Sequence, residues 1–481
     1  MILTNGVLRR IGELALVIAL GACASKQVVL RQSAVQGWAS SADASRKLTP
    51  IQGLQLEQGV TVSSDPAMIV IEQDRPQQTM VGFGAAMTDS SAYLFERVLD
   101  PAERDTLFAE LFGEGGLRLN FVRVPIGASD FSITHYSFDD VPPGQSDPQL
   151  AHFSMAGAQA AQIPALKAAR RANPNMVLMA TPWSAPGWMK DTDSLITGRL
   201  QPQFYPAFAA YFARYLDAME GEGLAVRYLS VQNEPRFEPK NYPGMAFPAR
   251  ERAQFIGQHL GPLLAARRNT VEILDWDHNW DHPEEPLAVL ADPQAARYVA
   301  GIAWHCYAGD PSAMQPVHDA HPAKDVFVTE CSGGEWGPHW GETLGWMIDR
   351  LIIEPTRAGS RGTMLWNLAL DEKYGPHLGG CSDCRGVVTI ESKTHGVTRN
   401  VEYYVLGHVS RFVQPGARRL PSRGGSGTVS HVAFRNPDGT LVLLLHNRGP
   451  NPAAQVVAAG RKTVRLDLPA GEIVTLTWRG Q

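Results

Sequence analysis

Two glutamates, Glu234 and Glu330, each end a short apolar segment of the kind that forms a buried strand. A lone glutamate in such a place would most often belong to a salt bridge. Two that face each other can do more, because cleavage of a glycosidic bond needs one protonated carboxyl group and one carboxylate. When the reaction retains the sugar's configuration, these groups lie ~5–5.5 Å apart. The pair therefore predicts acid–base and nucleophilic chemistry on a sugar, if the fold brings both residues together.

Eight β-branched, apolar segments alternate with helical patterns over about 300 residues and predict a (β/α)8 barrel. Helices are expected between them, for example over 204–221 and 249–268, and a last one over 401–412. A doubly wound sheet is the alternative, but the count of eight and the missing glycine-rich phosphate loop disfavour it. The predicted strands are 81–86, 119–127, 177–184, 228–234, 271–276, 301–307, 326–330 and 363–368.

In such a barrel the active site collects at the carboxyl ends of the strands. Carboxylates, amides and aromatic rings follow these ends, and a set of this kind can hold a polyhydroxylated ring by hydrogen bonding and stacking. In strand order they are Asp89; Arg123 and Asp130; Trp183 and Trp188; Asn233 and Glu234; Asp277, His278, Asn279 and Trp280; His305 and Tyr307; Glu330; and Trp366 and Asn367.

The remaining segments predict a smaller β domain beside the barrel. Short alternating runs separated by Gly, Pro and Asn follow Pro415, and the sequence NPDG at 436–439 is typical of a hairpin turn. We expect a β-sandwich over 415–481, completed by strands from 51–80, with the barrel over 81–414. Residues 24–50 are rich in Ser, Ala and Gln and are interpreted as a tether.

The N-terminus is typical of an export signal over residues 1–23. Two arginines precede a short apolar run that ends in LGAC, with Cys23 last. This end resembles the lipobox of bacterial lipoproteins, in which the cysteine is lipidated. An ordinary signal peptide, or a helix with a chance cysteine, is the alternative. Because alanine follows Cys23, we predict a lipid anchor in the outer membrane or periplasm of a Gram-negative bacterium.

Four further cysteines belong to the exported part. Cys381 and Cys384 lie in a glycine-rich loop and could form a small disulfide in an oxidising compartment. Cys306 and Cys331 each follow a predicted site residue, and strand alternation points them away from the barrel centre. We interpret these two as buried apolar fillers. No second cysteine or histidine pair stands at zinc-ligand spacing, so no metal site is expected.

The composition of the 481 residues is that of an ordinary globular protein, with 19% charged and 44% hydrophobic residues. A net charge of -5 disfavours a nucleic-acid partner, which would require a basic surface.

Seven motifs in order resemble glycoside hydrolase family 30, which includes glucosylceramidases and β-1,6-glucanases. They are GFGAAMTD (82–89), RVPI (123–126), DFS (130–132), TPWSAP (181–186), VQNEP (231–235), TECS (329–332) and WNLAL (366–370). The resemblance covers about residues 54–479. It implies a barrel with a β-sandwich side domain, retention of configuration, no cofactor, Glu234 as acid/base and Glu330 as nucleophile.

The same resemblance implies roles for neighbouring residues. Asp89 and Trp183 would bind the outer hydroxyls of the sugar, Asn233 its 2-hydroxyl, and Trp366 with Asn367 the floor of the subsite. Arg123 and Tyr307 would keep Glu330 ionised. His305 matches a histidine of the cleft, although a packed core residue is an equal alternative.

The prediction is a retaining β-glucosidase of the glucosylceramidase type, acting on a β-glucoside or glycolipid. An endo-β-1,6-glucanase acting on a β-glucan is the alternative within the same chemistry. A catalytically inactive, carbohydrate-binding surface lipoprotein is the alternative of another class, and the presence of both glutamates disfavours it. The membrane contact is expected through the N-terminal anchor only.

Overall fold

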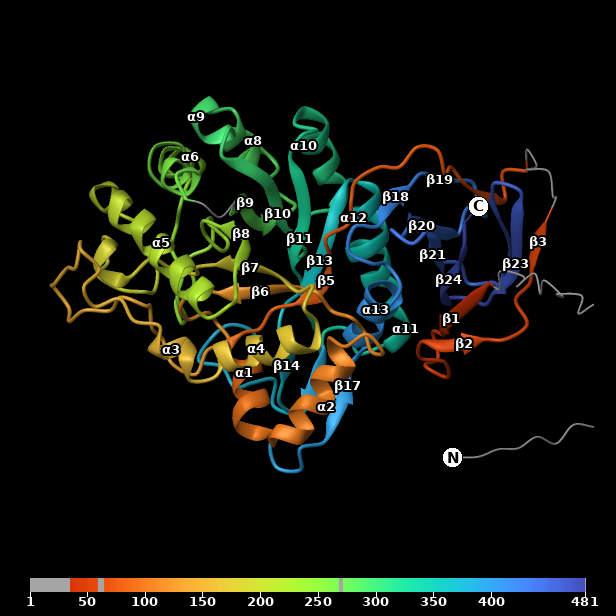
Figure 1. The fold of residues 1–481 in the computed structure, drawn as a ribbon, viewed down its shortest axis with the longest axis horizontal. Helices are drawn as coiled ribbons and strands as arrows, with labels where there is room; N and C mark the ends of the chain where they lie inside the picture. The colour runs from red at the N-terminus through yellow and green to blue at the C-terminus, as the bar shows by residue number, and fades with distance from the viewer. Residues whose placement is uncertain (1–34, 59–64, 268–270, 481) are drawn as a thin grey trace, which may run out of the picture. The chain divides into compact units, whose positions relative to one another are not determined.

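Eight parallel strands form one sheet in the computed structural model, which describes residues 35–58, 65–267 and 271–480 (Figure 1). The strands are neighbours in the order β5-β13-β11-β10-β9-β8-β7-β6. Almost all their residues are buried, as expected for parallel strands covered on both faces. Their bounds are β5 Gly82–Ala85, β6 Phe121–Pro125, β7 Val177–Thr181, β8 Val226–Ser230, β9 Glu272–Asn279, β10 Val299–His305, β11 Asp325–Glu330 and β13 Ser360–Leu365.

The two outer strands of this sheet, β5 and β6, lie against each other and close it into a barrel. Ala86, just beyond β5, forms a parallel bridge with Arg123 of β6. The approach requires glycine at position 84, because a Cβ there would lie 2.0 Å from the carbonyl oxygen of Phe121. All eight predicted strands are present, so the predicted (β/α)8 barrel is confirmed.

Helices follow the strands and surround the barrel (Figure 1). The helix expected over 204–221 is α5, and the one expected over 249–268 is α6 and α7 joined by a π-helical turn. The bounds are α1 Asp89–Tyr93, α2 Pro101–Leu111, α3 Ala156–Gln159, α4 Gln162–Ala172, α5 Tyr205–Gly221, α6 Ala249–Phe255, α7 Gly261–Ala265, α8 Glu284–Leu290, α9 Pro293–Ala296, α10 Met314–Ala320, α11 Trp340–Met347, α12 Glu354–Arg357 and α13 Val401–Ser410.

The interior of the barrel is packed with side chains beneath the strand ends. The rings of Phe121, Tyr228 and Phe327 contact one another, with centroids 5.0–5.8 Å apart. Because side chains on one face of a strand recur every second residue, Arg123 lies above Phe121 on the same interior face. The packed layer thus forms a floor on which the polar residues of the strand ends stand.

A β-sandwich follows the barrel and confirms the predicted side domain. One sheet has the order β18-β20-β21-β24-β1-β2 and the other β19-β4-β22-β23-β3. The bounds are β1 Gln36–Ser40, β2 Thr49–Ile51, β3 Leu56–Gln58, β4 Met68–Ile71, β18 Arg418–Leu420, β19 Ser422–Arg423, β20 Val429–Arg435, β21 Thr440–Asn447, β22 Ala453–Ala459, β23 Lys462–Leu468 and β24 Ile473–Arg479. Shorter strands are β12 Gly333–Gly334, β14 Ala369–Leu370, β15 Cys384–Arg385, β16 Val388–Ile390 and β17 Val397–Arg399.

The interpretation of residues 24–50 as a tether is wrong for its second half. Strand β1 lies within this range, pairs with β24 along five residues and places Ala39 in the core. The segment lacks a clear hydrophobic period because glycine and serine flank its two apolar residues, Trp38 and Ala39. Strand β1 is stabilised by its pairing with β24, the last strand of the chain, and its own composition does not reveal this partner.

Helix α13 connects the barrel to the sandwich through a buried histidine. His408 is hydrogen-bonded through Nδ1 to the hydroxyl of Thr475 (2.9 Å) and through Nε2 to that of Ser40 (2.8 Å). The rings of Trp38 and Phe412 pack beside it, with centroids 4.4 Å apart. Both ends of the described chain are therefore fixed to the last helix of the barrel.

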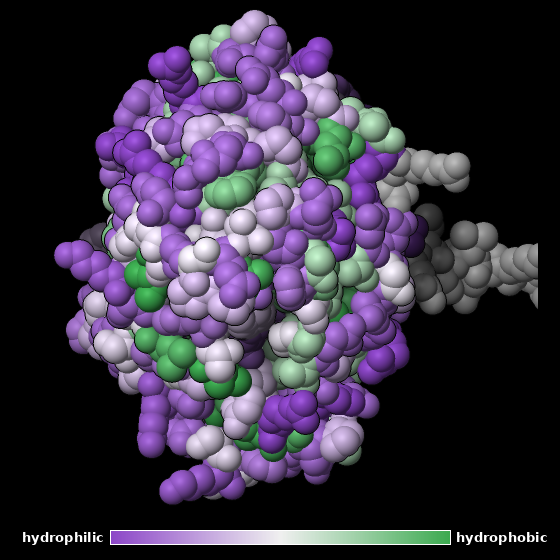
Figure 2. Space-filling model, turned by 90° about the vertical axis from the view of Figure 1, so that its left-hand side faces the viewer, coloured by the Kyte–Doolittle hydropathy of each residue, from purple (hydrophilic) through white to green (hydrophobic). Residues whose placement is uncertain are grey.

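Hydrophilic side chains cover most of the face shown in Figure 2, which is the α5 side of the barrel, and hydrophobic ones lie between them in small groups. Among the described residues, no helix has the length and apolar character needed to cross a bilayer.

Candidate active site

Glu330 is the last residue of β11, and both its carboxylate oxygens accept hydrogen bonds. Arg123 Nη1 donates to Oε2, and the hydroxyl of Tyr307 donates to Oε1 at 2.8 Å. Arg123 is fully buried. A buried guanidinium and a phenol hydroxyl both favour the ionised form of a carboxyl group.

Glu234 lies four residues beyond β8, in a turn that directs its side chain toward Glu330. Its Oε1 lies 3.1 Å from His305 Nδ1 and 3.6 Å from His278 Nδ1. Polar atoms of Glu234, His305 and Glu330 all lie within 4.8 Å of one another. This proximity suits the ~5–5.5 Å carboxyl separation of retaining glycosidases rather than the ~6.5–9.5 Å of inverting ones.

The backbone that holds Glu234 is strained. Glu234, Trp276 and Asp277 have φ values of 47°, 77° and 49°, in the left-handed region that non-glycine residues seldom adopt. The amide of Glu234 donates to the carbonyl oxygen of Asp277 at 3.0 Å, so two of these residues hold each other. Such strain tends to persist where a side chain must be aimed at one point, and here that side chain is Glu234.

Asp277 of β9 connects the residues around the two glutamates. One of its oxygens accepts from Arg123 (2.8 Å) and Thr181 (3.0 Å), and the other lies 2.7 Å from the hydroxyl of Thr329 and 3.0 Å from His305 Nε2. The sequence places Asp277 among the polar residues at the strand ends but predicts no individual role for it. Its four partners come from four other strands, β6, β7, β10 and β11. Spacing along the chain does not show that these strands bring their side chains together at Asp277.

The charges around the glutamates shift several pKa values. Burial by itself would lower the pKa of His305, but Glu330, Asp277 and Glu234 outweigh this and raise it to about 9. Burial would raise the pKa of Asp277, but Arg123 and His305 hold it well below its ordinary value. Burial raises the pKa of Glu234, and His305 opposes part of this rise. Glu234 is therefore suited to carry a proton.

A cavity of about 700 Å³ opens above the two glutamates. The indole of Trp366 forms part of its wall and stacks on Trp183 behind it, with centroids 5.0 Å apart at 22°. The guanidinium of Arg123 lies 4.9 Å from the Trp183 ring. The lining residues are Asp130, Glu234, Phe237, Glu238, Pro239, Lys240, Asn241, Tyr242, His278, Asn279, Tyr307, Glu330, Trp336, Trp366, Gly380, Cys381 and Cys384.

Asp130 is a second carboxyl group of this cavity. Trp366 Nε1 lies 3.4 Å from its Oδ2, and its Oδ1 is buried without a hydrogen-bond partner. Burial and the negative charge of Glu330 raise the pKa of Asp130 to about 8. We singled out Asp130 at a strand end but predicted no role for it. An unpaired buried carboxyl oxygen facing a cavity is a place for a ligand hydroxyl group to donate.

Three other predicted site residues are buried beside the cavity or behind it. Asn233 accepts a hydrogen bond from Arg123 Nη2 at 2.8 Å. His305 is fully buried between Glu234 and Asp277. Asn367, also fully buried, accepts a hydrogen bond from the hydroxyl of Thr88 and does not line the cavity. Asn233 and His305 thus contact the glutamate cluster, whereas Asn367 supports the neighbouring loop.

Asp89 does not line the cavity that holds the glutamates. Its carboxylate instead accepts hydrogen bonds from the hydroxyl of Tyr136, at 3.0 and 3.2 Å, in a separate cavity. Asp89 is the first residue of α1, and its side chain points to the far side of the loop that carries Asp130. The predicted contact between Asp89 and the sugar beside Glu234 and Glu330 is therefore wrong.

Cys306 and Cys331 form a disulfide, so their interpretation as apolar fillers is wrong. The register of β10 and β11 pairs His305 with Glu330, which brings the next residues of both strands side by side. Sequence spacing does not show this register. Cys381 and Cys384 form the small disulfide considered from the sequence, and it lines the cavity. The fifth cysteine, Cys23, lies outside the described residues.

Comparison with known proteins identifies the class to which this barrel and site belong. Residues 80–413 match the glycosyl hydrolase family 30 TIM-barrel domain, and residues 416–476 match the family 30 beta sandwich domain. The chain therefore belongs to glycosyl hydrolase family 30, whose members are glycoside hydrolases.

Two relatives and one solved structure show which named proteins this chain resembles. The endo-1,6-beta-D-glucanase neg1 of Aspergillus fumigatus is 33% identical over 77% of this chain and 79% of its own length. The lysosomal acid glucosylceramidase of Mus musculus is 29% identical over 86% and 84%. The solved structure of the endo-beta1,6-glucanase BT3312 is 28% identical, covers 93% of this chain and 100% of that one, and superposes with a TM-score of 0.85.

Proposed function

We propose that this chain is a retaining endo-β-1,6-glucanase in which Glu330 is the nucleophile and Glu234 the general acid/base. The observation that carries the proposal is the pair itself. Glu330 accepts hydrogen bonds from Arg123 and Tyr307, whereas burial raises the pKa of Glu234 within 4.8 Å of it. One carboxylate and one proton-carrying carboxyl group are what a double displacement requires.

In the first step, the Glu330 carboxylate attacks the anomeric carbon while Glu234 donates its proton to the leaving oxygen. A covalent glycosyl-enzyme forms, and the aglycone departs as an alcohol. In the second step, Glu234, now ionised, takes a proton from water, and the water oxygen displaces Glu330 from the same carbon. Two inversions leave the configuration of the sugar unchanged.

Asn233 is suited to hold the 2-hydroxyl of the reacting sugar. A guanidinium offers only donors, so the oxygen of the Asn233 amide must face Arg123 and its NH2 group is turned away. That NH2 group can donate to a hydroxyl whose contact strengthens in the transition state. Asp130 and Trp366, which share the cavity wall, supply an acceptor for a further hydroxyl and a flat apolar surface for the ring.

The lining beyond the glutamates favours a sugar over a lipid as the leaving group. Phe237 and Trp336 expose about half of their surface there, at 47% and 57%. Glu238, Lys240 and Asn241 line the same part of the cavity. Aromatic faces between charged and amide groups suit a sugar with apolar faces and polar edges, whereas an acyl chain would desolvate these groups without compensation.

The comparisons support the same choice. Sequence identity is higher to the fungal endo-β-1,6-glucanase than to the mouse glucosylceramidase, and the BT3312 glucanase covers nearly the whole chain. The endo-β-1,6-glucanase activity is thus better supported than the glucosylceramidase-type activity that the sequence analysis favours.

The N-terminal sequence supports a proposal for where the enzyme acts. Arginines, an apolar run and the LGAC sequence support export with lipidation of Cys23, which would hold the enzyme at a bacterial outer membrane or periplasm through its N-terminus. A membrane-held glucanase would act on glucan chains that reach the cell surface.

A hydrolysis panel tests the proposed activity. We expect the purified chain to release oligosaccharides of several lengths from β-1,6-glucan, because an endo enzyme cuts within the chain, and to act slowly on glucosylceramide. Chromatography of the products over time measures both, with Glu330→Gln as the control for contaminating enzymes. Faster turnover of glucosylceramide than of β-1,6-glucan would reverse the choice between the two activities.

A further inference from the structure

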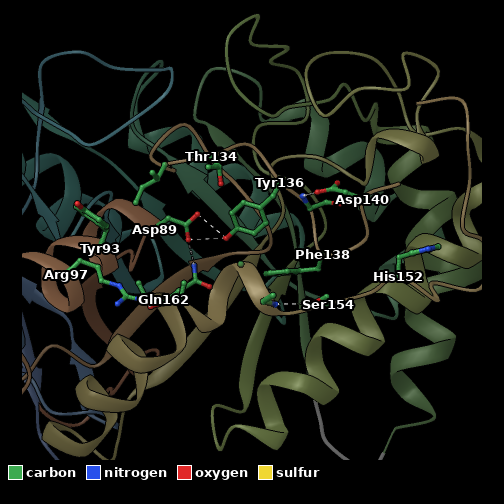
Figure 3. Close-up of a pocket in the computed structure, with 16 residues that line it drawn as sticks. Asp89, Tyr93, Arg97, Thr134, Tyr136, Phe138, Asp140, His152, Ser154 and Gln162 are labelled. Carbon is green, nitrogen blue, oxygen red and sulfur yellow. Dashed lines mark hydrogen bonds between the residues drawn. The ribbon is translucent and has the colours of Figure 1, made fainter. Parts of the chain in front are cut away.

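A second cavity, of about 730 Å³, lies at the same end of the barrel, beyond the loop that follows β6 (Figure 3). Residues after β5, the loop over 133–140 and the start of α4 line it. None of its lining residues lines the cavity of the two glutamates. The function proposed above makes no use of it.

Figure 3 shows a small polar cluster among the residues that line this second cavity. The hydroxyl of Tyr136 lies 3.0 and 3.2 Å from the two oxygens of Asp89 and shares its proton between them, and Gln162 Nε2 lies 3.5 Å from the same carboxylate. The donors that these contacts give Asp89 are uncharged, and burial raises its pKa to about 6. The cluster therefore places a carboxylate that is held by uncharged donors in the wall of the cavity.

Gln162 carries an unused acceptor at this point. The residue is 1% exposed, and its Oε1 is buried without a hydrogen-bond partner. Together with Asp89 it gives the floor of the cavity two acceptor side chains. Buried polar atoms are nearly always satisfied, so an orphaned acceptor beside a cavity indicates a missing donor. A ligand rich in hydroxyl groups would supply it.

The rim of the second cavity is apolar and exposed. Tyr93 is 36% exposed and Ile133 is 44% exposed, and both line the opening. An exposed ring above a floor of hydrogen-bond acceptors resembles the arrangement that holds a pyranose, with its apolar face on the ring and its hydroxyls below.

The loop after β6 separates the two cavities. It directs Asp130 into the cavity of the glutamates and, three residues later, Ile133 into the second one. The amide of Ser90, next to Asp89, donates to the carbonyl oxygen of Phe131 at 3.2 Å, and the Phe131 ring packs on Trp366. One loop therefore forms a wall of both cavities.

We propose that the second cavity is an additional binding site for a glucosyl unit of a β-1,6-glucan chain, with Asp89 and Gln162 as acceptors for its hydroxyls and Tyr93 as its stacking surface. This inference rests on the proposed function for the identity of the sugar. A site beside the catalytic cavity keeps a polymer near the glutamates between successive cuts, which raises the local concentration of substrate.

Binding of an oligosaccharide to a chain that does not cleave it tests the site. The full chain with Glu330→Gln is titrated calorimetrically with β-1,6-linked glucotriose, alone and with Asp89→Asn added. We expect two molecules bound per chain without the second substitution and one with it, because loss of the charged acceptor weakens binding by about tenfold or more. Asp74→Asn, the same substitution at an exposed loop residue, is the matched control and should leave two sites.

Variants of Tyr93, at the exposed rim, test the second site without changing the buried side chains of its floor. In the same Glu330→Gln chain, Tyr93→Ala should weaken the second site, whereas Tyr93→Phe, which keeps the ring, should not. A single bound molecule in both Glu330→Gln and Glu330→Gln/Asp89→Asn would overturn this inference and leave the proposed glucanase intact. If neither variant binds the trisaccharide, both the proposed function and this inference are contradicted.

Discussion

At the scale of residues, the balance of buried charge explains how Glu234 and Glu330, which have the same side chain, can have different roles. Arg123 and His305 bring two positive charges, and Asp277 and Glu330 bring two negative ones. A further negative charge on Glu234 would leave this buried group unbalanced. Burial of such an unbalanced charge is unfavourable, so the pKa of Glu234 is raised.

Substitution of each glutamate should separate their roles. Glu330→Ala should abolish hydrolysis, and azide should restore turnover of an activated aryl glucoside by giving the α-glycosyl azide. Glu234→Ala should lose ~10²–10⁴-fold in kcat/KM on poor leaving groups but much less on good ones, because only the former need a proton. Rates on a series of aryl β-glucosides measure this, and equal losses across the series would contradict the acid role.

At the scale of elements, the disulfide Cys306–Cys331 links β10 and β11 directly after His305 and Glu330. The link lies on the outer side of the two strands, so it supports the site without entering it. Because the residues are 25 apart in the sequence, closing this loop also restricts the unfolded chain.

Removal of this link should destabilise the barrel. We expect Cys306→Ser/Cys331→Ser to lower the free energy of unfolding by about 3 kcal/mol, as estimated for a loop of this length. Cys381→Ser/Cys384→Ser is the matched control and should cost much less, because those residues are only three apart. Denaturant unfolding of both variants measures the difference, and equal destabilisation would refute the argument from loop length.

At the scale of the whole molecule, the described chain begins and ends in the same sandwich, where β1 pairs with β24. The strands that precede the barrel thus help to complete the domain that follows it. The described chain therefore enters the molecule through the sandwich rather than through the barrel strands that carry the site.

Lipidation of Cys23 can be measured directly. Cells that express the full chain should incorporate labelled palmitate into it, whereas Cys23→Ser should not be labelled, because the thiol is the point of attachment. Fractionation should find the unlabelled variant released from membranes. Labelling of both chains would disprove the predicted lipobox.

The sequence by itself determined the barrel, the sandwich and the two glutamates. Strand periodicity and the positions of strand ends are local properties, and each was readable from a few consecutive residues. The barrel then carries Glu234 and Glu330 to one rim by geometry that is common to all such folds.

Only the tertiary structure decided which other residues join them. Asp277 and Asp130 contact the site, Asp89 lies in another cavity, and Cys306 pairs with Cys331. Each outcome depends on the register between strands or on the side of a loop from which a side chain projects. A shift of one residue would change either of these. Register and side-chain direction are set by packing between segments that are far apart in the chain. The local pattern that placed the two glutamates therefore cannot predict them.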